Sequence, residues 1–266
     1  MVTHYTYMRR LIKEEKENTM EKKEQLIIVL SGKKQSGKTT ISNFIVGTYL
    51  LETKRIKNFH ITDEGSLGAI RTSGEGIVVP DGEFNKIFPD EDVKIYQFAD
   101  ELKLFCINVL GLTHDQCYGS DEEKNSLVRT CRWGGIPHTI TERYGKAGDE
   151  AMTAREVMQV FGTDMVRAMC PNAWADATYR RVLQEKKRLA ILSDGRFPNE
   201  LGIGKKYGAK SVRLLRVVAG DTHPSETALD VYTDFDFVLD NRNMGIEMSN
   251  DTAKPFIKQW LLELEG

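Results

Sequence analysis

A glycine-bounded loop behind the first apolar run constrains the fold more than any other stretch of the chain. The run Leu26–Leu30 is apolar and β-prone, as a strand buried on both faces of a parallel sheet must be. The residues after it match the spacing G-x-x-x-x-G-K-[ST] through Gly32, Gly37, Lys38 and Thr39. Apolar residues then recur at helical spacing over 41–49. The sequence therefore predicts a strand, a phosphate-binding loop and a helix in succession.

Each part of this loop has its own chemical task. Glycines let successive backbone N–H groups point at an anion held at a helix N-terminus. Lys38 supplies a positive charge for the β- and γ-phosphates, and Thr39 supplies a hydroxyl for Mg²⁺. The alternative is a glycine turn that binds nothing, which the flanking strand and helix patterns disfavour. We predict ATP and Mg²⁺ as ligands, and we assign to ATP the loop residues Gly32, Lys33, Gln35, Ser36, Gly37, Lys38, Thr39 and Thr40.

The rest of the chain alternates apolar strands with amphipathic helices. Further strands are predicted over 93–100, 189–194, 212–218 and 235–239. Strands that alternate with helices make a doubly wound α/β fold, with ligands at the carboxyl ends of a parallel sheet. We therefore predict a P-loop NTPase fold of about five parallel strands.

Local signals predict where several helices begin and end. Thr153 and Glu156 form a capping box that opens one helix, and Gly162 is expected to end it. Pro198 and Gly208 are expected to bound a later helix. Thr252 is expected to open the last helix.

Three segments stand apart from this alternation. Residues 1–25 are rich in Lys, Arg and Glu and predict a solvated charged arm. Residues 26–266 are assigned to the P-loop domain. Within it, 58–92 has two β-branched runs around Ser73-Gly74-Glu75 and predicts a hairpin that leaves the main sheet. The polar segment 111–150 is long for a connection and is predicted to act as a lid over the site.

Composition excludes several classes of protein. The 37 basic and 39 acidic residues give a net charge of −2, so the broad positive field of a nucleic-acid-binding protein is absent and no direct nucleic-acid binding is expected. No run of 18 apolar residues is present, so no membrane span is predicted. The four cysteines form no C-x-x-C pair, which is typical of free thiols and favours a cytoplasmic location.

Polar residues at strand ends are the remaining site candidates. Asp194 and Arg196 follow one strand and are predicted to act on Mg²⁺ and on a phosphate, the alternative being a loop ion pair. Asp100 ends another strand and is predicted to contact the phosphate acceptor or the metal, the alternative being a solvated strand end or a helix cap. Asn241 is predicted to contact an adenine edge or to form an ordinary turn.

Arginines can stabilise the negative charge that develops during phosphoryl transfer. The candidates are Arg129, Arg132 and Arg143 in the lid segment, and Arg155 and Arg196 beside predicted structure. For each arginine the alternative is a solvated position on the surface.

Five motifs in order resemble the phage deoxynucleoside monophosphate kinases, a branch of the P-loop kinases, and this resemblance implies a fold similar to that of nucleoside monophosphate kinases. They are S-G-K-K-Q-S-G-K at 31–38, Y-Q-F-A-D-E-L-K at 96–103, R-E-V-M-Q-V-F-G-T-D at 155–164, D-G-R-F-P-N-E at 194–200 and D-T-H-P-S-E at 221–226. The segment 58–92 and the charged arm are additional to the family pattern. Asp100 is not a required acid of that pattern.

The resemblance implies an enzyme that transfers a phosphoryl group from ATP to a deoxynucleoside monophosphate, with Mg²⁺, in deoxynucleotide biosynthesis. It also implies a homodimer, located in the host cytoplasm if the chain is phage-encoded. We assign Lys38, Asp194 and Arg196 to catalysis, and Thr39 and Asp194 to Mg²⁺. The acceptor would be bound by Asp100, Lys103, Arg155, Gln159, Thr163, Asp164 and Arg196.

Two alternative functions remain open. A P-loop kinase of another small acceptor, such as dephospho-coenzyme A, would share the loop and the fold. A nucleotide-driven switch or motor ATPase would share the loop alone, and the chain has no guanine-reading N-K-x-D motif.

Overall fold

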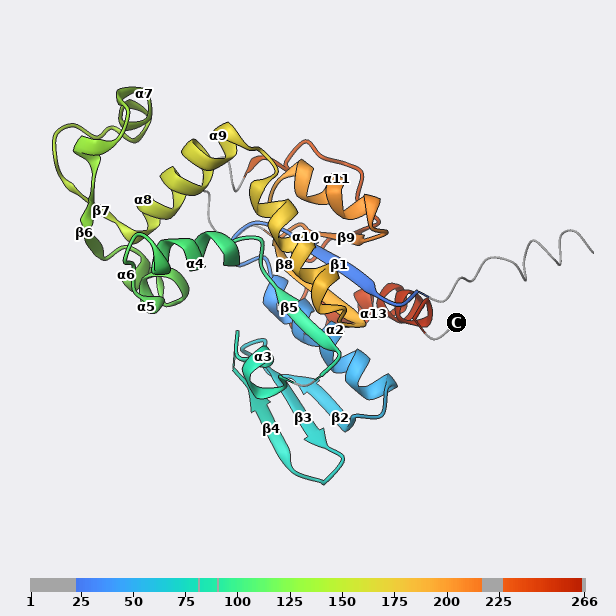
Figure 1. Cartoon of the computed structure of the whole chain (residues 1–266). Helices are drawn as coiled ribbons and strands as arrows, with labels where there is room; N and C mark the ends of the chain where they lie inside the picture. Colours follow the sequence, from blue (N-terminus) through green and yellow to red (C-terminus); the bar gives the residue numbers. More distant parts are fainter. Residues whose placement is uncertain (1–22, 81, 90, 217–226, 265–266) are drawn as a thin grey trace, which may run out of the picture.

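A five-stranded parallel sheet forms the centre of the molecule in the computed structural model (Figure 1), which describes residues 23–80, 82–89, 91–216 and 227–264. The strand order is β10-β9-β1-β8-β5 and every neighbouring pair is parallel. The strands are β1 (Leu26–Ser31), β5 (Val93–Tyr96), β8 (Leu189–Gly195), β9 (Lys210–Leu214) and β10 (Phe237–Leu239). This confirms the predicted doubly wound α/β fold of five strands.

The middle strand β1 is buried on both faces, because helices cover each side of the sheet. All six of its residues are buried. Leu26, Ile28 and Leu30 belong to the core beneath α2 (Lys38–Glu52) and α13 (Ile246–Leu262). Ile27 and Val29 belong to the opposite core, beneath α10 (Ala173–Glu185) and α11 (Pro198–Lys206). The alternation of side chains along a strand explains why an unbroken apolar run was needed here.

A second, antiparallel sheet is inserted between α2 and β5. It consists of β2 (Ile56–Ile61), β3 (Leu67–Arg71) and β4 (Gly76–Val79), and a short helix α3 (Phe84–Ile87) follows it. The hairpin predicted within 58–92 is confirmed as β3 and β4, and β2 adds a third strand. Figure 1 shows this sheet below α2, away from the central sheet. Its inner residues Leu67, Ala69 and Val79 join the same core as α2.

Contacts with α2 fix the inserted sheet in place. The Phe59 ring of β2 lies against Gly47, where an added Cβ would come within 2.4 Å of a ring carbon. The buried Asn43 amide donates to the backbone oxygen of Gly65, at 2.9 Å, in the turn between β2 and β3. The helix that carries the phosphate loop is therefore also the base of the insertion.

The segment 111–150, predicted as a lid, folds with its neighbours into a small unit that projects away from the central sheet (Figure 1). A core of its own, which includes Val128, Trp133 and Met152, holds this unit together. Its elements are α4 (Asp100–Asn108), α5 (His114–Tyr118), α6 (Asp121–Lys124), β6 (Leu127–Arg132), η1 (Trp133–Gly135), α7 (His138–Thr141), η2 (Glu142–Tyr144), β7 (Ala151–Thr153) and α8 (Ala154–Gln159).

Several predicted boundaries are wrong. The strand predicted over 212–218 runs over Lys210–Leu214 as β9. Gly162 does not end the helix that the Thr153 capping box opens, because the helix continues through a π-helical stretch, η3 (Val160–Val166), into α9 (Arg167–Met169). A Cβ on Gly162 would lie 2.5 Å from Leu102 Cδ2, so close packing explains this glycine. The strand predicted over 93–100 ends at Tyr96, and Asp100 is the first residue of α4.

The last helix also begins earlier than predicted. It starts at Ile246, after Gly245, and so includes Thr252 and Pro255 in its interior. The boundaries predicted at Pro198 and Gly208 are confirmed, because α11 begins at Pro198 and ends before Gly208. Residues 1–22 of the predicted arm and the block at 221–226 lie outside the described residues.

The contact between Gly47 and Phe59 gives a prediction about stability. Gly47→Ala improves helix propensity but forces the Phe59 ring to move, so we expect a net loss of about 1–2 kcal/mol in the free energy of unfolding. Gly202→Ala is the matched control, because it also lies within a helix and its added Cβ meets nothing within 4 Å. We expect this control to gain about 0.5–1 kcal/mol. Urea denaturation of both variants measures the difference, and a stabilised Gly47→Ala variant would contradict the packing.

Candidate active site

The phosphate loop connects the buried end of β1 to the first turn of α2. Lys38 folds back over the loop and donates from Nζ to the backbone oxygens of Gly32, at 2.7 Å, and Lys33, at 2.8 Å. Gly37 precedes α2 with a φ of +96°, in the left-handed region that favours glycine. The first turn of α2 carries no acidic residue. The positive end of the helix therefore faces the loop without a competing carboxylate, as an anion site requires.

Buried contacts hold this loop in shape. Asn241, which is 2% exposed, donates from Nδ2 to the backbone oxygen of Ser36 at 2.8 Å and accepts from the backbone N–H of Arg216 at 2.9 Å. A Cβ on Gly32 would come within 2.4 Å of Ser36 Oγ. Both ends of the Asn241 amide are used, so the geometry favours a loop-positioning role over the predicted contact with an adenine edge.

A cavity of about 990 Å³ opens beside the loop. Its wall is built from the start of α2, α3, the β5–α4 junction, α5, α6, the α8–α9 helix and the end of β8. The tertiary structure thus brings together nine of the residues predicted from the sequence, namely Lys38, Thr39, Asp100, Lys103, Arg155, Gln159, Thr163, Asp194 and Arg196.

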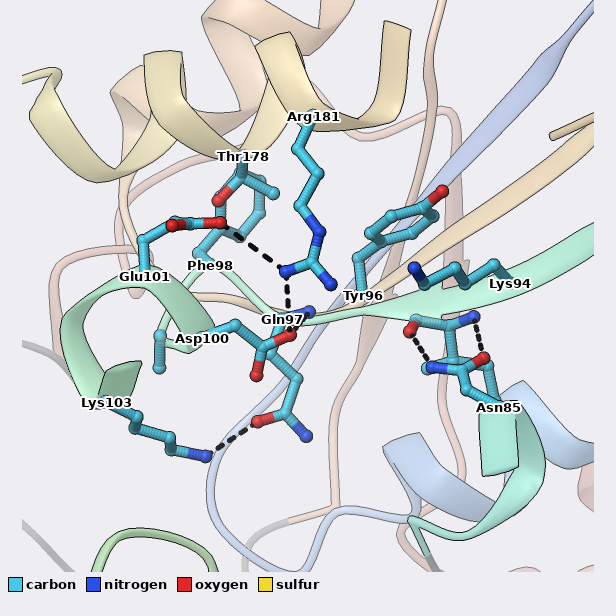
Figure 2. A network of polar contacts seen from close by, with 12 residues as sticks. Asn85, Lys94, Tyr96, Gln97, Phe98, Asp100, Glu101, Lys103, Thr178 and Arg181 are labelled. Atoms are coloured by element: carbon cyan, nitrogen blue, oxygen red, sulfur yellow. Dashed lines mark hydrogen bonds and ion pairs between the residues drawn. The ribbon is translucent and has the colours of Figure 1, made fainter. Parts of the chain in front are cut away.

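Figure 2 shows the polar network at the β5–α4 junction, on one wall of this cavity. Asp100 accepts from the backbone N–H of Gln97 at 3.3 Å, and its Oδ2 lies 3.9 Å from Arg181 Nη1 of α10. Lys103 donates from Nζ to Gln97 Oε1 at 2.8 Å and lies over the Tyr118 ring, 4.3 Å from its centroid. Burial raises the pKa of the Asp100 carboxyl and lowers the pKa of the Lys103 ammonium.

The end of β8 forms another part of the wall. Asp194 accepts from the backbone N–H groups of Phe98, at 2.6 Å, and Ala99, at 3.2 Å. This carboxylate therefore joins β8 to the β5–α4 junction, and it also lines the cavity. The two contacts leave lone pairs of the carboxylate for other groups.

A buried carboxylate sets the turn that carries Arg196. Glu200 is 1% exposed and accepts from the backbone N–H groups of Arg196, at 2.7 Å, and Phe197, at 3.1 Å. Arg167 of α9 donates to the same carboxylate at 2.6 Å and lies over the Phe197 ring, 3.9 Å from its centroid. The α9 helix and the Arg196 turn are thereby joined.

The three lid arginines lie elsewhere: Arg129, Arg132 and Arg143 are not among the described residues that line the cavity. Arg143 pairs with Asp164 at 3.0 Å, and Arg132 pairs with Asp149 at 2.8 Å. Asp164, predicted to bind the acceptor, is also outside this lining, and it accepts from the Tyr144 hydroxyl at 2.8 Å. These residues hold the projecting unit together in this structure.

The remaining loop residues lie behind or beside the cavity wall. Gly32, Lys33, Gln35, Ser36, Gly37 and Thr40 form the loop and the first turn without being among the described lining residues. Lys33 pairs with Asp230 at 3.1 Å. Among the described residues, the buried Ser36 Oγ has no hydrogen-bond partner, which suits a loop whose polar groups await a ligand.

Sequence reasoning missed several residues of the wall. Asp121, Lys124 and Arg167 all line the cavity. No local pattern distinguishes them, because Asp121 and Lys124 belong to a charged four-residue helix and Arg167 lies beyond a glycine that was expected to end its helix. Their place in the site depends on how α6 and α9 pack around the cavity.

Comparison with known proteins agrees with the fold. Residues 26–250 match the family model described as deoxynucleotide monophosphate kinase. The chain belongs to this family. A relative from Acanthamoeba polyphaga mimivirus, provisionally named a deoxynucleotide monophosphate kinase, is 29% identical over 164 residues, which cover 56% of this chain and 75% of the relative. Among the described residues, no helix has the length and apolar character to cross a membrane.

Asp100 gives a prediction about pH. Its pKa is raised by burial, so the folded state binds the proton more tightly than the unfolded state. The free energy of unfolding therefore falls as pH rises from the ordinary aspartate pKa, about 3.9, through the raised value. Asp100→Asn removes this cost, and we expect a higher melting temperature than wild type at pH 7.5 with a smaller difference at pH 4. Melting curves of wild type and variant at both pH values measure this. The prediction is contradicted if the melting temperature of the variant, taken relative to wild type, is lower at pH 7.5 than at pH 4.

Proposed function

We propose that the chain transfers the γ-phosphoryl group of ATP to a deoxynucleoside monophosphate, giving a deoxynucleoside diphosphate and ADP. One observation carries the proposal: Lys38 and Thr39 of the phosphate loop line the same cavity as Arg155, Gln159 and Thr163 of the α8–α9 helix. Donor and acceptor groups can thus meet in one cavity. The family match supports the same reaction.

The roles of the residues follow from charge and position. The backbone N–H groups of the loop and Lys38 would hold the β- and γ-phosphates of ATP. Arg155 and Arg196 both line the cavity and would bind the phosphate of the acceptor. Phosphoryl transfer depends mainly on positioning and on cations that balance the charge of the transferred group, so these side chains supply most of what the reaction needs.

Mg²⁺ fits the same region, because the Thr39 hydroxyl and the Asp194 carboxylate both line the cavity and offer oxygen ligands. When bound, the ion would neutralise charge on the phosphate oxygens. Asp194 and its neighbours are already ordered by the hydrogen bonds from Phe98 and Ala99.

Water must be kept from the γ-phosphate, since otherwise ATP is hydrolysed. The projecting unit carries α5 and α6 into the cavity wall, and its movement toward the loop would reduce access of solvent. A homodimer and a cytoplasmic location remain predictions from the resemblance.

The test is acceptor-dependent release of ADP. Purified protein is given ATP and Mg²⁺, with and without each of dAMP, dGMP, dCMP and dTMP. We expect release that depends on one or more acceptors, and a loss of about 10²-fold or more in Lys38→Ala. Lys258→Ala is the control, since Lys258 lies on α13 and pairs with Glu52.

Two results would contradict the proposal. ADP released at the same rate without any acceptor would favour a switch or motor ATPase. ADP released only with dephospho-coenzyme A would favour the other small-acceptor kinase.

A further inference from the structure

Arg216, just beyond the end of β9, holds the segment 241–244 between β10 and α13. The guanidinium donates from Nε and Nη2 to the backbone oxygen of Asn241, at 3.2 and 3.1 Å. Its Nη2 also donates to the backbone oxygen of Met244. The backbone N–H of Arg216 donates to Asn241 Oδ1 at 2.9 Å. Four hydrogen bonds from one residue thus attach this segment to the end of β9.

The asparagine that Arg216 holds reaches the phosphate loop. Asn241 Nδ2 donates to the backbone oxygen of Ser36 at 2.8 Å. This oxygen and the N–H of Gly37 belong to one planar trans peptide group, so they point in opposite directions. The contact with Asn241 therefore fixes the direction of the Gly37 N–H. Among the residues that the structure describes, nothing accepts from this N–H, and it is available to an anion at the start of α2.

An arginine suits this task because its donors lie in one plane. A guanidinium presents five N–H groups in a fixed fork, whereas a lysine ammonium is a compact charge with rotatable donors. Arg216 is half-buried, and it is not among the described residues that line the cavity. Its contacts therefore reach a ligand through the segment that it holds.

We propose that Arg216 is a positioning residue for the phosphates of ATP. It fixes the segment 241–244, Asn241 in turn fixes the peptide group of Ser36 and Gly37, and the Gly37 N–H is thereby directed at a phosphate oxygen. The proposal rests on the proposed kinase function for the identity of the ligand. Such placement matters because a displacement of about 1 Å can reduce a rate by about 10²-fold.

Arg188 provides a matched control at the other end of α13. It donates to the backbone oxygen of Leu264 at 2.7 Å, and Leu264 follows α13 whereas Met244 precedes it. Arg188 directly precedes β8, at the edge of the sheet opposite to the phosphate loop. Loss of either arginine removes a contact near one end of α13, but only the loss of Arg216 alters the path to the loop.

The test is calorimetric titration of the full chain with a non-hydrolysable ATP analogue and Mg²⁺. Arg216→Met loses the charged donors to two backbone oxygens, and we expect a Kd about 10-fold higher than wild type. Arg216→Lys keeps the charge without the planar fork, so we expect a smaller loss of affinity. Arg188→Met is expected to bind the analogue as wild type does. The Kd for each of dAMP, dGMP, dCMP and dTMP is expected to be unchanged in all three variants.

Two further measurements separate positioning from a general loss of stability. Asn241→Ala and the double variant with Arg216→Met form a cycle, and we expect the double variant to bind the analogue no more weakly than the weaker single variant, because both residues act along one path. Hydrogen exchange without ligand is expected to be faster at the Gly37 amide in Arg216→Met than in wild type or Arg188→Met. Circular dichroism checks that every variant is folded.

Three results would overturn the proposal. They are an unchanged Kd for the analogue in Arg216→Met, an equal loss in Arg188→Met, or losses that add in the double variant. If wild type binds the analogue but releases no ADP with any acceptor, the proposed function fails while the titrations still decide the role of Arg216. If wild type does not bind the analogue, the assignment to ATP fails, and equal exchange at Gly37 in wild type and Arg216→Met would also overturn the positioning of the loop.

Discussion

Burial of β1 on both faces determines where the chemistry of this protein takes place. The strand lies in the middle of the parallel sheet and is covered by α2 and α13 on one side and by α10 and α11 on the other. Its direction delivers the phosphate loop to the carboxyl edge of the sheet, where β8 also ends. The loop N–H groups, Lys38 and Asp194 are close to one another because two buried strands run in parallel.

The cavity is assembled from segments far apart in the chain, and buried polar contacts keep them together. Asn241 supports the loop from the end of β10, Asp194 joins β8 to α4, and Glu200 joins α11 to Arg167. Each of these contacts uses a side chain to pair with backbone or guanidinium groups that would otherwise be buried without partners. The polar network therefore aligns the elements on which the proposed donor and acceptor sites lie.

The inserted antiparallel sheet is joined to the main domain and to the cavity wall. Its inner face shares a core with α2, and α3 behind it contributes to the cavity wall. Asn85 of α3 pairs with both backbone groups of Ile95, at 2.6 and 3.0 Å (Figure 2). A side-chain amide thus occupies the free edge of β5, which protects an edge strand and fixes α3 at the same time.

The sequence by itself determined the elements whose signals are local. The apolar run of β1, the glycine spacing of the loop and the capping box at Thr153 each depend on neighbouring residues, and each appears in the structure as predicted. The same holds for the hairpin around Gly74. Tertiary structure decided the rest, because the role of a residue in the fold or in the site depends on which distant residues pack against it. Leu102 against Gly162 explains why the helix continues, and the packing of α6 brings Lys124 into the cavity while Arg132 and Arg143 lie outside it.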